Sequence, residues 1–245
     1  MRREILKITG DDREHFLQGL VTNDVTRLKD GLVYTAMLTP QGKYIADFFL
    51  VPAEGAILLD VDAQLAAMLS QRLTMYKLRS KVAIEATGLH MHRGLGAHPD
   101  DGFADPRHAG LGWRAYRTEP QGEDETDWTA LRVSLGVPET GAELGPDTFI
   151  LEVGFERLHG VDFKKGCYVG QEVTARMKHK TELRKGLARV QADGPLSPGD
   201  EILSDGKPAG TVLSVAGNTA LAYLRYERAE KGIEAGGQAL RFERL

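Results

Sequence analysis

The sequence predicts an α+β protein that ends in a small β-barrel. In the first part of the chain, strand-like runs alternate with stretches of helical spacing, as where Ala56–Val61 precedes an apolar helical pattern over residues 62–73. In the last part only short β-like runs occur, and turns rich in Gly, Pro and Asn separate them. We therefore predict a larger domain over residues 1–181 and a barrel domain over residues 182–245.

The first elements are predicted from patterning and turn chemistry. Ile5 to Ile8 indicates a short strand, and Asp11 with Glu14 three positions later is typical of the start of a helix. Residues 32–38 and 44–51 then indicate two strands joined by the turn Thr39-Pro40-Gln41-Gly42-Lys43. These elements predict a hairpin in a sheet with helices packed on it.

Asp47 lies in the second strand of that hairpin. Strand alternation places it on one face with the apolar residues Ile45, Phe49 and Val51. If this face is buried, the carboxylate needs a partner or a role, because unpaired burial of a charge is costly. If the face is open to solvent, Asp47 is an ordinary strand residue. The residues alone leave both interpretations open.

The middle of the chain predicts one loop and two more strands. Residues 81–85 alternate as a strand, whereas residues 98–108 are rich in Pro, Gly and Asp and predict a loop. That loop carries histidines and acids without regular ligand spacing, so no metal site is expected. In the strand expected over residues 111–117, Arg114 and Tyr116 share a face.

An acidic connection follows that strand. Residues 119–127 carry five acids and a glycine, which predicts an exposed segment, and Asp127 can cap the helix that follows.

Composition restricts the classes of function. The chain has 245 residues, 42% hydrophobic and 27% charged, as expected for a soluble globular protein. Its net charge of -4 and pI near 6.0 give no general attraction to nucleic acid. The single cysteine excludes an internal disulfide and a self-contained cysteine cluster for zinc or iron–sulfur.

The N-terminus and hydropathy bear on location. The first ten residues contain no apolar core of signal-peptide length, and no stretch approaches the ~20 apolar residues of a membrane span. From these absences we predict a cytoplasmic protein with no membrane partner, and we expect a monomer.

The only cysteine, Cys167, lies in a distinctive stretch, residues 164–180. The apolar residues Val173 and Met177 are four positions apart, as are the oppositely charged Glu172 and Arg176. Nothing in residues 171–180 breaks a helix, which predicts a loop followed by a helix. A cysteine just before a helix and among basic residues is in a position that favours a thiolate. The alternative is that a lone cysteine is a small buried apolar residue. The surrounding glycines and lysines favour the functional interpretation.

This stretch resembles a known family signature. Lys165-Gly166-Cys167-Tyr168-x-Gly170-Gln171-Glu172, followed by Arg176, is similar to the motif of the YgfZ-type folate-binding proteins, bacterial counterparts of a mitochondrial iron–sulfur cluster assembly factor. Other segments also resemble blocks of that family, and together they span nearly the whole chain: residues 8–11, 16–19, 22–24, 39–43, 79–82, 105–107, 111–114 and 135–139.

The resemblance implies a fold, a cofactor and a set of site residues. The fold is an aminomethyltransferase-like folate-binding body followed by a β-barrel domain, and the cofactor is tetrahydrofolate. Related folate-dependent aminomethyltransferases carry an acid in the stretch of Asp47, which makes Asp47 the candidate folate contact. Where those enzymes have a further glutamate, this chain presents Arg114 or Tyr116. The signature adds five candidate folate contacts: Lys165, Tyr168, Gln171, Glu172 and Arg176.

A basic patch overlaps the signature. Between Phe163 and Gly186 there are seven Lys or Arg against two acids. Such a patch attracts an anionic partner, for example a polyglutamylated folate tail, a phosphate or RNA, although a solvated helix face is the default interpretation. Interleaved aromatic residues, which single-stranded nucleic acids require, are absent, so direct RNA binding is not expected.

Three functions follow. The first, selected by the resemblance, is a folate-dependent accessory factor for assembly or repair of iron–sulfur clusters, with Cys167 as the reactive group and iron–sulfur proteins or their assembly machinery as partners. Its clients would include tRNA-modifying enzymes. The second is a folate-dependent aminomethyltransferase that transfers a one-carbon unit. The third is a binding scaffold whose cysteine is structural.

Overall fold

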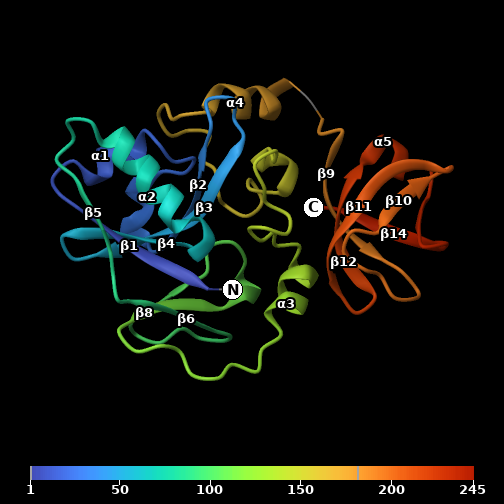
Figure 1. Ribbon diagram of the computed structural model, residues 1–245, viewed down its shortest axis with the longest axis horizontal. Coiled ribbons are helices and arrows are strands. Elements are labelled where there is room, and N and C mark those ends of the chain that lie inside the picture. Colours follow the sequence, from blue (N-terminus) through green and yellow to red (C-terminus); the bar gives the residue numbers. More distant parts are fainter. Residues whose placement is uncertain (1, 181) are drawn as a thin grey trace. The chain divides into compact units, whose positions relative to one another are not determined.

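The computed structural model describes residues 2–180 and 182–245. Their contacts divide the chain into two units, which Figure 1 shows in colours that follow the sequence. Unit 1 consists of Met1–Asp124 and Glu156–Val173, and unit 2 consists of Glu125–Phe155 and Thr174–Leu245. The boundary predicted between residues 181 and 182 falls on residue 181, which lies outside the described residues, so it stays a prediction.

Unit 1 contains a five-stranded sheet in the order β2-β3-β4-β1-β5, with all neighbours antiparallel. Two helices, α1 (Arg13–Gln18) and α2 (Ala63–Lys77), contribute Leu17, Leu69 and Leu73 to the core on one face of this sheet. The predicted strands and the hairpin are confirmed, and the bounds are β1 Arg3–Thr9, β2 Val33–Leu38, β3 Tyr44–Ala53, β4 Ala56–Asp62 and β5 Ala83–Ala86.

Strand β3 is buried on both faces. Phe48 and Leu50 belong to the apolar core, whereas Phe49 on the opposite face lies under arginine side chains. Asp47 shares the face of Phe49 and is only 5% exposed. Of the two interpretations left open for this carboxylate, the buried one is therefore confirmed.

The start of α1 differs from the prediction. Asp12, not Asp11, occupies the N-cap position, and its side chain makes no cap hydrogen bond. Its carboxylate instead accepts a hydrogen bond of 2.7 Å from the backbone N–H of Lys81. The prediction of an Asp11 cap is wrong because the acid in this turn holds a distant segment rather than the helix end. A 3-10 helix, η1 (Val25–Asp30), follows, with Asp24 as its cap.

A second, three-stranded sheet in the order β6-β8-β7 completes unit 1. Its strands are β6 (His90–Gly94), β7 (Gly102–Ala104) and β8 (Trp113–Arg117), and a 3-10 helix, η2 (Ala109–Leu111), precedes β8. Strand β7 lies inside residues 98–108, so the prediction of an uninterrupted loop there is wrong. A strand of three residues is too short for alternation to reveal.

Unit 2 is built around a closed barrel in the order β10-β11-β12-β9-β14-β13. The barrel and its apolar core confirm the predicted C-terminal β-barrel fold. The last two strands and the helix before them were not predicted. The helix has four residues and the first of these strands has three, and the second strand carries three charged side chains among its seven residues. The bounds are β9 Lys185–Gln191, β10 Glu201–Ser204, β11 Lys207–Ala216, β12 Thr219–Arg225, α5 Tyr226–Ala229, β13 Ile233–Ala235 and β14 Gln238–Arg244.

Three further elements lie before the barrel. Helix α3 (Trp128–Leu135) is capped as predicted, since the Asp127 carboxylate accepts a hydrogen bond of 2.9 Å from the N–H of Ala130. The 3-10 helix η3 spans Ile150–Val153, and α4 spans Gln171–Lys180, which confirms the helix predicted after Cys167. Among the residues that the structure describes, no helix is both long enough and apolar enough to cross a membrane.

Candidate functional site

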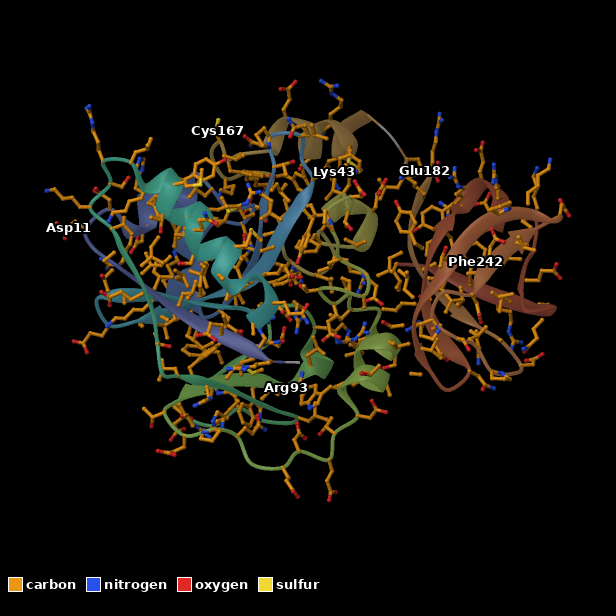
Figure 2. All side chains as sticks on the ribbon, viewed as in Figure 1. Asp11, Lys43, Arg93, Cys167, Glu182 and Phe242 are labelled. Carbon is orange, nitrogen blue, oxygen red and sulfur yellow. The ribbon has the colours of Figure 1, made fainter. Side chains whose placement is uncertain are left out.

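Cys167 lies at the surface, on the loop that precedes α4 (Figure 2). The helix begins four residues later, at Gln171. Because the thiol is exposed, the interpretation of Cys167 as a buried apolar residue is wrong. A partner molecule can therefore approach this sulfur directly.

The residue two positions earlier fixes the loop. Lys165 is only 7% exposed, and its Nζ donates hydrogen bonds to the carbonyl oxygens of Gln18 (2.8 Å) and Val21 (2.5 Å). The same Nζ lies 5.1 Å from the centre of the buried Tyr168 ring. Burial lowers the pKa of Lys165 to about 8, and the nearby charge of Asp24 opposes that effect. Lys165 is thus an internal anchor of the loop.

Backbone hydrogen bonds hold the loop on both sides of the cysteine. The N–H of Val169 donates to the carbonyl of Gly19 (3.3 Å), and the N–H of Asp162 donates to the carbonyl of Thr22 (3.0 Å). The Asp162 carboxylate accepts from the backbone of Lys164 (2.6 Å). The exposed thiol is therefore carried by a segment that residues 18–22 hold in place.

Two glycines let the motif pack against the β2–β3 turn. Gly170 has φ +86°, and a Cβ there would lie 2.6 Å from the carbonyl oxygen of Thr39. Across the contact, Gly42 has φ +74°, and a Cβ there would lie 2.8 Å from Cβ of Val173. Both positions need glycine, for its backbone conformation and for the close approach. The motif and the hairpin that carries Asp47 are therefore in direct contact.

The Asp47 carboxylate lies between two phenols. Tyr44 donates to Oδ1 at 2.7 Å and Tyr34 donates to Oδ2 at 3.0 Å. Burial, together with the charge of Asp47, raises the pKa of Tyr34 well above its ordinary value. The phenol therefore stays protonated and donates to the carboxylate at neutral pH. Asp47 is thus held in one orientation as a hydrogen-bond acceptor.

Arg114 and Tyr116 contact a second buried carboxylate, that of Asp60 in β4. The Asp60 Oδ2 atom accepts from Arg114 Nη1 (2.8 Å) and from the Tyr116 hydroxyl (2.9 Å), and Oδ1 accepts from Arg3 Nε. Burial raises the pKa of Asp60, but the charges of Arg3 and Arg114 outweigh that effect and hold it below its ordinary value. These side chains join the two sheets of unit 1.

Asp105 extends this ionic cluster. Its carboxylate accepts from Arg114 Nε (3.0 Å) and from Arg107 Nη2 (2.8 Å). Both guanidinium groups lie over the Phe49 ring, at 4.0 Å for Arg114 and 4.9 Å for Arg107. Neither Asp60 nor Asp105 was predicted as a site residue, although residues 105–107 resemble one of the family blocks. A signal was present for Asp60, because it interrupts the apolar run Ala56–Val61.

The remaining predicted residues lie on α4. Gln171 is half-buried, whereas Glu172 and Arg176 are exposed. The structure thus places Lys165 against residues 18–21 and beside the Tyr168 ring. It places Arg114 and Tyr116 in a separate cluster around Asp60. Within residues 2–180 and 182–245, no group of three His, Cys, Asp or Glu side chains is placed to hold a metal ion.

The fold is that of a known enzyme class. The structure is similar to the crystal structure of glycine cleavage system aminomethyltransferase T from Bartonella henselae, with a TM-score of 0.79 over 97% of this chain and 82% of that chain. Identity to that enzyme is 15%, so the likeness shows the fold alone. Residues 184–245 match the family model described as "CAF17, C-terminal beta-barrel domain". The protein therefore has an aminomethyltransferase-like fold with a C-terminal β-barrel domain.

Curated relatives define the family. The chain is 32% identical to the mitochondrial iron–sulfur cluster assembly factor IBA57 of Mus musculus, over 92% of this chain and 76% of that protein. It is 30% identical to the Homo sapiens protein over the same shares. The chain belongs to the IBA57 family of iron–sulfur cluster assembly factors.

The same comparison corrects the predicted location. These relatives are named as mitochondrial proteins, so the prediction of a cytoplasmic protein is wrong. That prediction rested on the absence of an apolar N-terminal segment and of a membrane span. Such absences do not distinguish one aqueous compartment from another.

Proposed function

We propose that this protein is an accessory factor for the assembly or repair of iron–sulfur clusters, that it binds tetrahydrofolate, and that Cys167 is its reactive group. Membership of the IBA57 family is the observation that carries the proposal. The exposed thiol on an anchored loop supports it, because a thiolate is the form that ligates iron or attacks an electrophile. Iron–sulfur proteins, including tRNA-modifying enzymes, are the proposed clients.

The residues around Asp47 fit a reduced folate in their chemistry. The N–H groups of a reduced pterin need an acceptor, and Asp47 is a buried carboxylate held by two tyrosine hydroxyls. On this proposal Asp47 accepts from the folate. Arg114, Tyr116 and Lys165 support the fold around it through their hydrogen bonds to Asp60 and to backbone carbonyls.

Calorimetric titration with tetrahydrofolate tests the cofactor. Replacing Asp47 by Asn keeps the shape of the side chain and removes its charge. We expect a loss of about 1.5–3 kcal/mol, or roughly 10- to 150-fold in Kd, which is typical of a hydrogen bond to a charged group. Asp101→Asn is the matched control, since Asp101 forms an exposed ion pair with Arg117. If wild type shows no saturable binding, folate is excluded. If Asp47→Asn binds as tightly as the control, Asp47 is not the contact.

Maturation of a reporter iron–sulfur enzyme tests the role of the thiol. We expect Cys167→Ser to lose maturation while it keeps the wild-type affinity for tetrahydrofolate. The substitution exchanges one exposed atom, so stability should change by no more than about 0.5 kcal/mol. Full maturation by the variant would instead favour the scaffold whose cysteine is structural.

The alternative is a folate-dependent aminomethyltransferase, which the fold similarity brings into consideration. Transfer of a one-carbon unit from an aminomethyl donor to tetrahydrofolate would favour it, provided that Asp47→Asn abolishes transfer and Cys167→Ser does not. The signature around Cys167 favours the assembly factor over this alternative.

A further inference from the structure

The C-terminal end of α2 and the residues that follow it expose apolar side chains. We call residues 72–81 the α2 tip. Met75 is 69% exposed, Tyr76 37% and Leu78 88%, and these three are most of the large hydrophobic side chains exposed in the described part of the chain. Figure 1 shows the connection from α2 to β5 at an edge of unit 1. An apolar group presented in this way commonly marks an interaction surface.

The same ten residues are strongly basic. Arg72, Lys77, Arg79 and Lys81 lie in the α2 tip, and no acid occurs between Asp62 and Glu85 in a chain whose net charge is -4. None of these four cations forms an ion pair within the described residues. The acid that contacts the segment is Asp12, whose carboxylate accepts from the backbone N–H of Lys81. The tip therefore presents positive charge around its apolar side chains.

The backbone holds the most exposed of these side chains outward. Leu78 ends α2 with φ +44° and ψ −106°, a conformation that residues other than glycine rarely adopt. Strained backbone of this kind gathers at functional positions. Leu78 thus combines a positive φ with a side chain that is 88% exposed.

We infer that the α2 tip docks on the surface of an anionic phospholipid membrane. This goes beyond the proposed function and departs from the expectation of no membrane partner, which considered membrane spans alone. A protruding Leu78 enters the acyl region without a complementary pocket, and the four cations reach the lipid phosphates. An acidic protein would need a cavity shaped to this projection. Charge and shape together therefore favour a bilayer.

Co-flotation with vesicles tests the inference with the full chain. We expect wild type to float with vesicles of equal phosphatidylcholine and phosphatidylglycerol, to lose binding at high salt, and not to bind vesicles of phosphatidylcholine alone. The double substitution Arg79→Glu with Lys81→Glu reverses the charge of two side chains and should weaken binding to the anionic vesicles by at least about 30-fold. The matched control, Lys207→Glu with Lys231→Glu, reverses the charge of two exposed lysines of unit 2 and should bind the vesicles like wild type.

Apolar contact is tested separately. Leu78→Gly with Met75→Ser removes the two most exposed apolar side chains of the tip, and glycine accepts the φ of residue 78, so the variant should fold. It should bind anionic vesicles more weakly than wild type, whereas Leu95→Ser, at a side chain 49% exposed elsewhere in unit 1, should not.

Two results would overturn the membrane inference: wild type does not float with anionic vesicles, or both tip variants float as well as their controls. If wild type does not float and the tip variants also lose iron–sulfur maturation, the surface binds a protein instead.

Discussion

Replacing Gly170 by Ala measures how strongly the cysteine motif depends on its contact with the hairpin. At φ +86°, a side chain costs about 1–2 kcal/mol in backbone strain. The new Cβ would also lie 2.6 Å from the Thr39 carbonyl oxygen and 2.9 Å from Cβ of Leu38. Such overpacking costs about 1–3 kcal/mol more. We therefore expect Gly170→Ala to lower the free energy of unfolding by about 2–5 kcal/mol, a large share of the ~5–15 kcal/mol typical of a protein.

The assay is urea unfolding followed by fluorescence of Trp113, which belongs to unit 1, in a Trp128→Phe background. Gly166→Ala is the matched control in the same motif, because a Cβ there meets nothing within 4 Å and the backbone does not require glycine. The control should be unchanged or stabilised by up to about 1 kcal/mol. Equal stability of the two variants would refute the close approach between motif and hairpin.

Two further substitutions test the buried charges of unit 1. Arg114→Leu removes a partner from both Asp60 and Asp105 and should cost about 3–5 kcal/mol at neutral pH. Because both carboxyls have a pKa below the ordinary 3.8, the wild-type advantage in urea unfolding should shrink as the pH falls below about 4, and an advantage independent of pH would contradict the ionic role. Lys165 has a pKa of about 8 instead of 10.5, so the folded state binds fewer protons than the unfolded state between these values. The unfolding free energy of wild type should therefore rise relative to Lys165→Met from pH 8 to pH 10, and a flat difference would argue against burial of the charge.

Local chemistry made much of the fold predictable. The hairpin followed from a turn that contains Pro40 and Gly42 between two β-like runs. Helix α2 followed from the apolar helical pattern over residues 62–73, and the start of α3 followed from Asp127 as a capping residue. In each case neighbouring residues carry the signal. Strand β7 is only three residues long, and β14 pairs with the distant strand β9, a pairing that a single sequence does not display.

The candidate site was predictable only in part, because several of its contacts join residues that are far apart in the sequence. The signature located Cys167, and the structure exposes it, but the pattern could not show that Lys165 points inward to carbonyls far away in the sequence. Strand alternation was uninformative for Asp47 because β3 is buried on both faces. Arg114 and Tyr116 were recognised as sharing a face, yet their common partner Asp60 lies in another strand, 54 positions from Arg114.

The interleaving of the two units along the chain has a consequence for synthesis on the ribosome. Unit 1 needs the segment Glu156–Val173, and unit 2 has already begun with Glu125–Phe155 before that segment is made. The ammonium of Lys165 reaches back 147 positions to the carbonyl of Gln18. The thiol loop can therefore take its final form only after most of the polypeptide has been translated. A ribosome stalled before this point would carry a nascent chain that cannot yet present its cysteine to a partner.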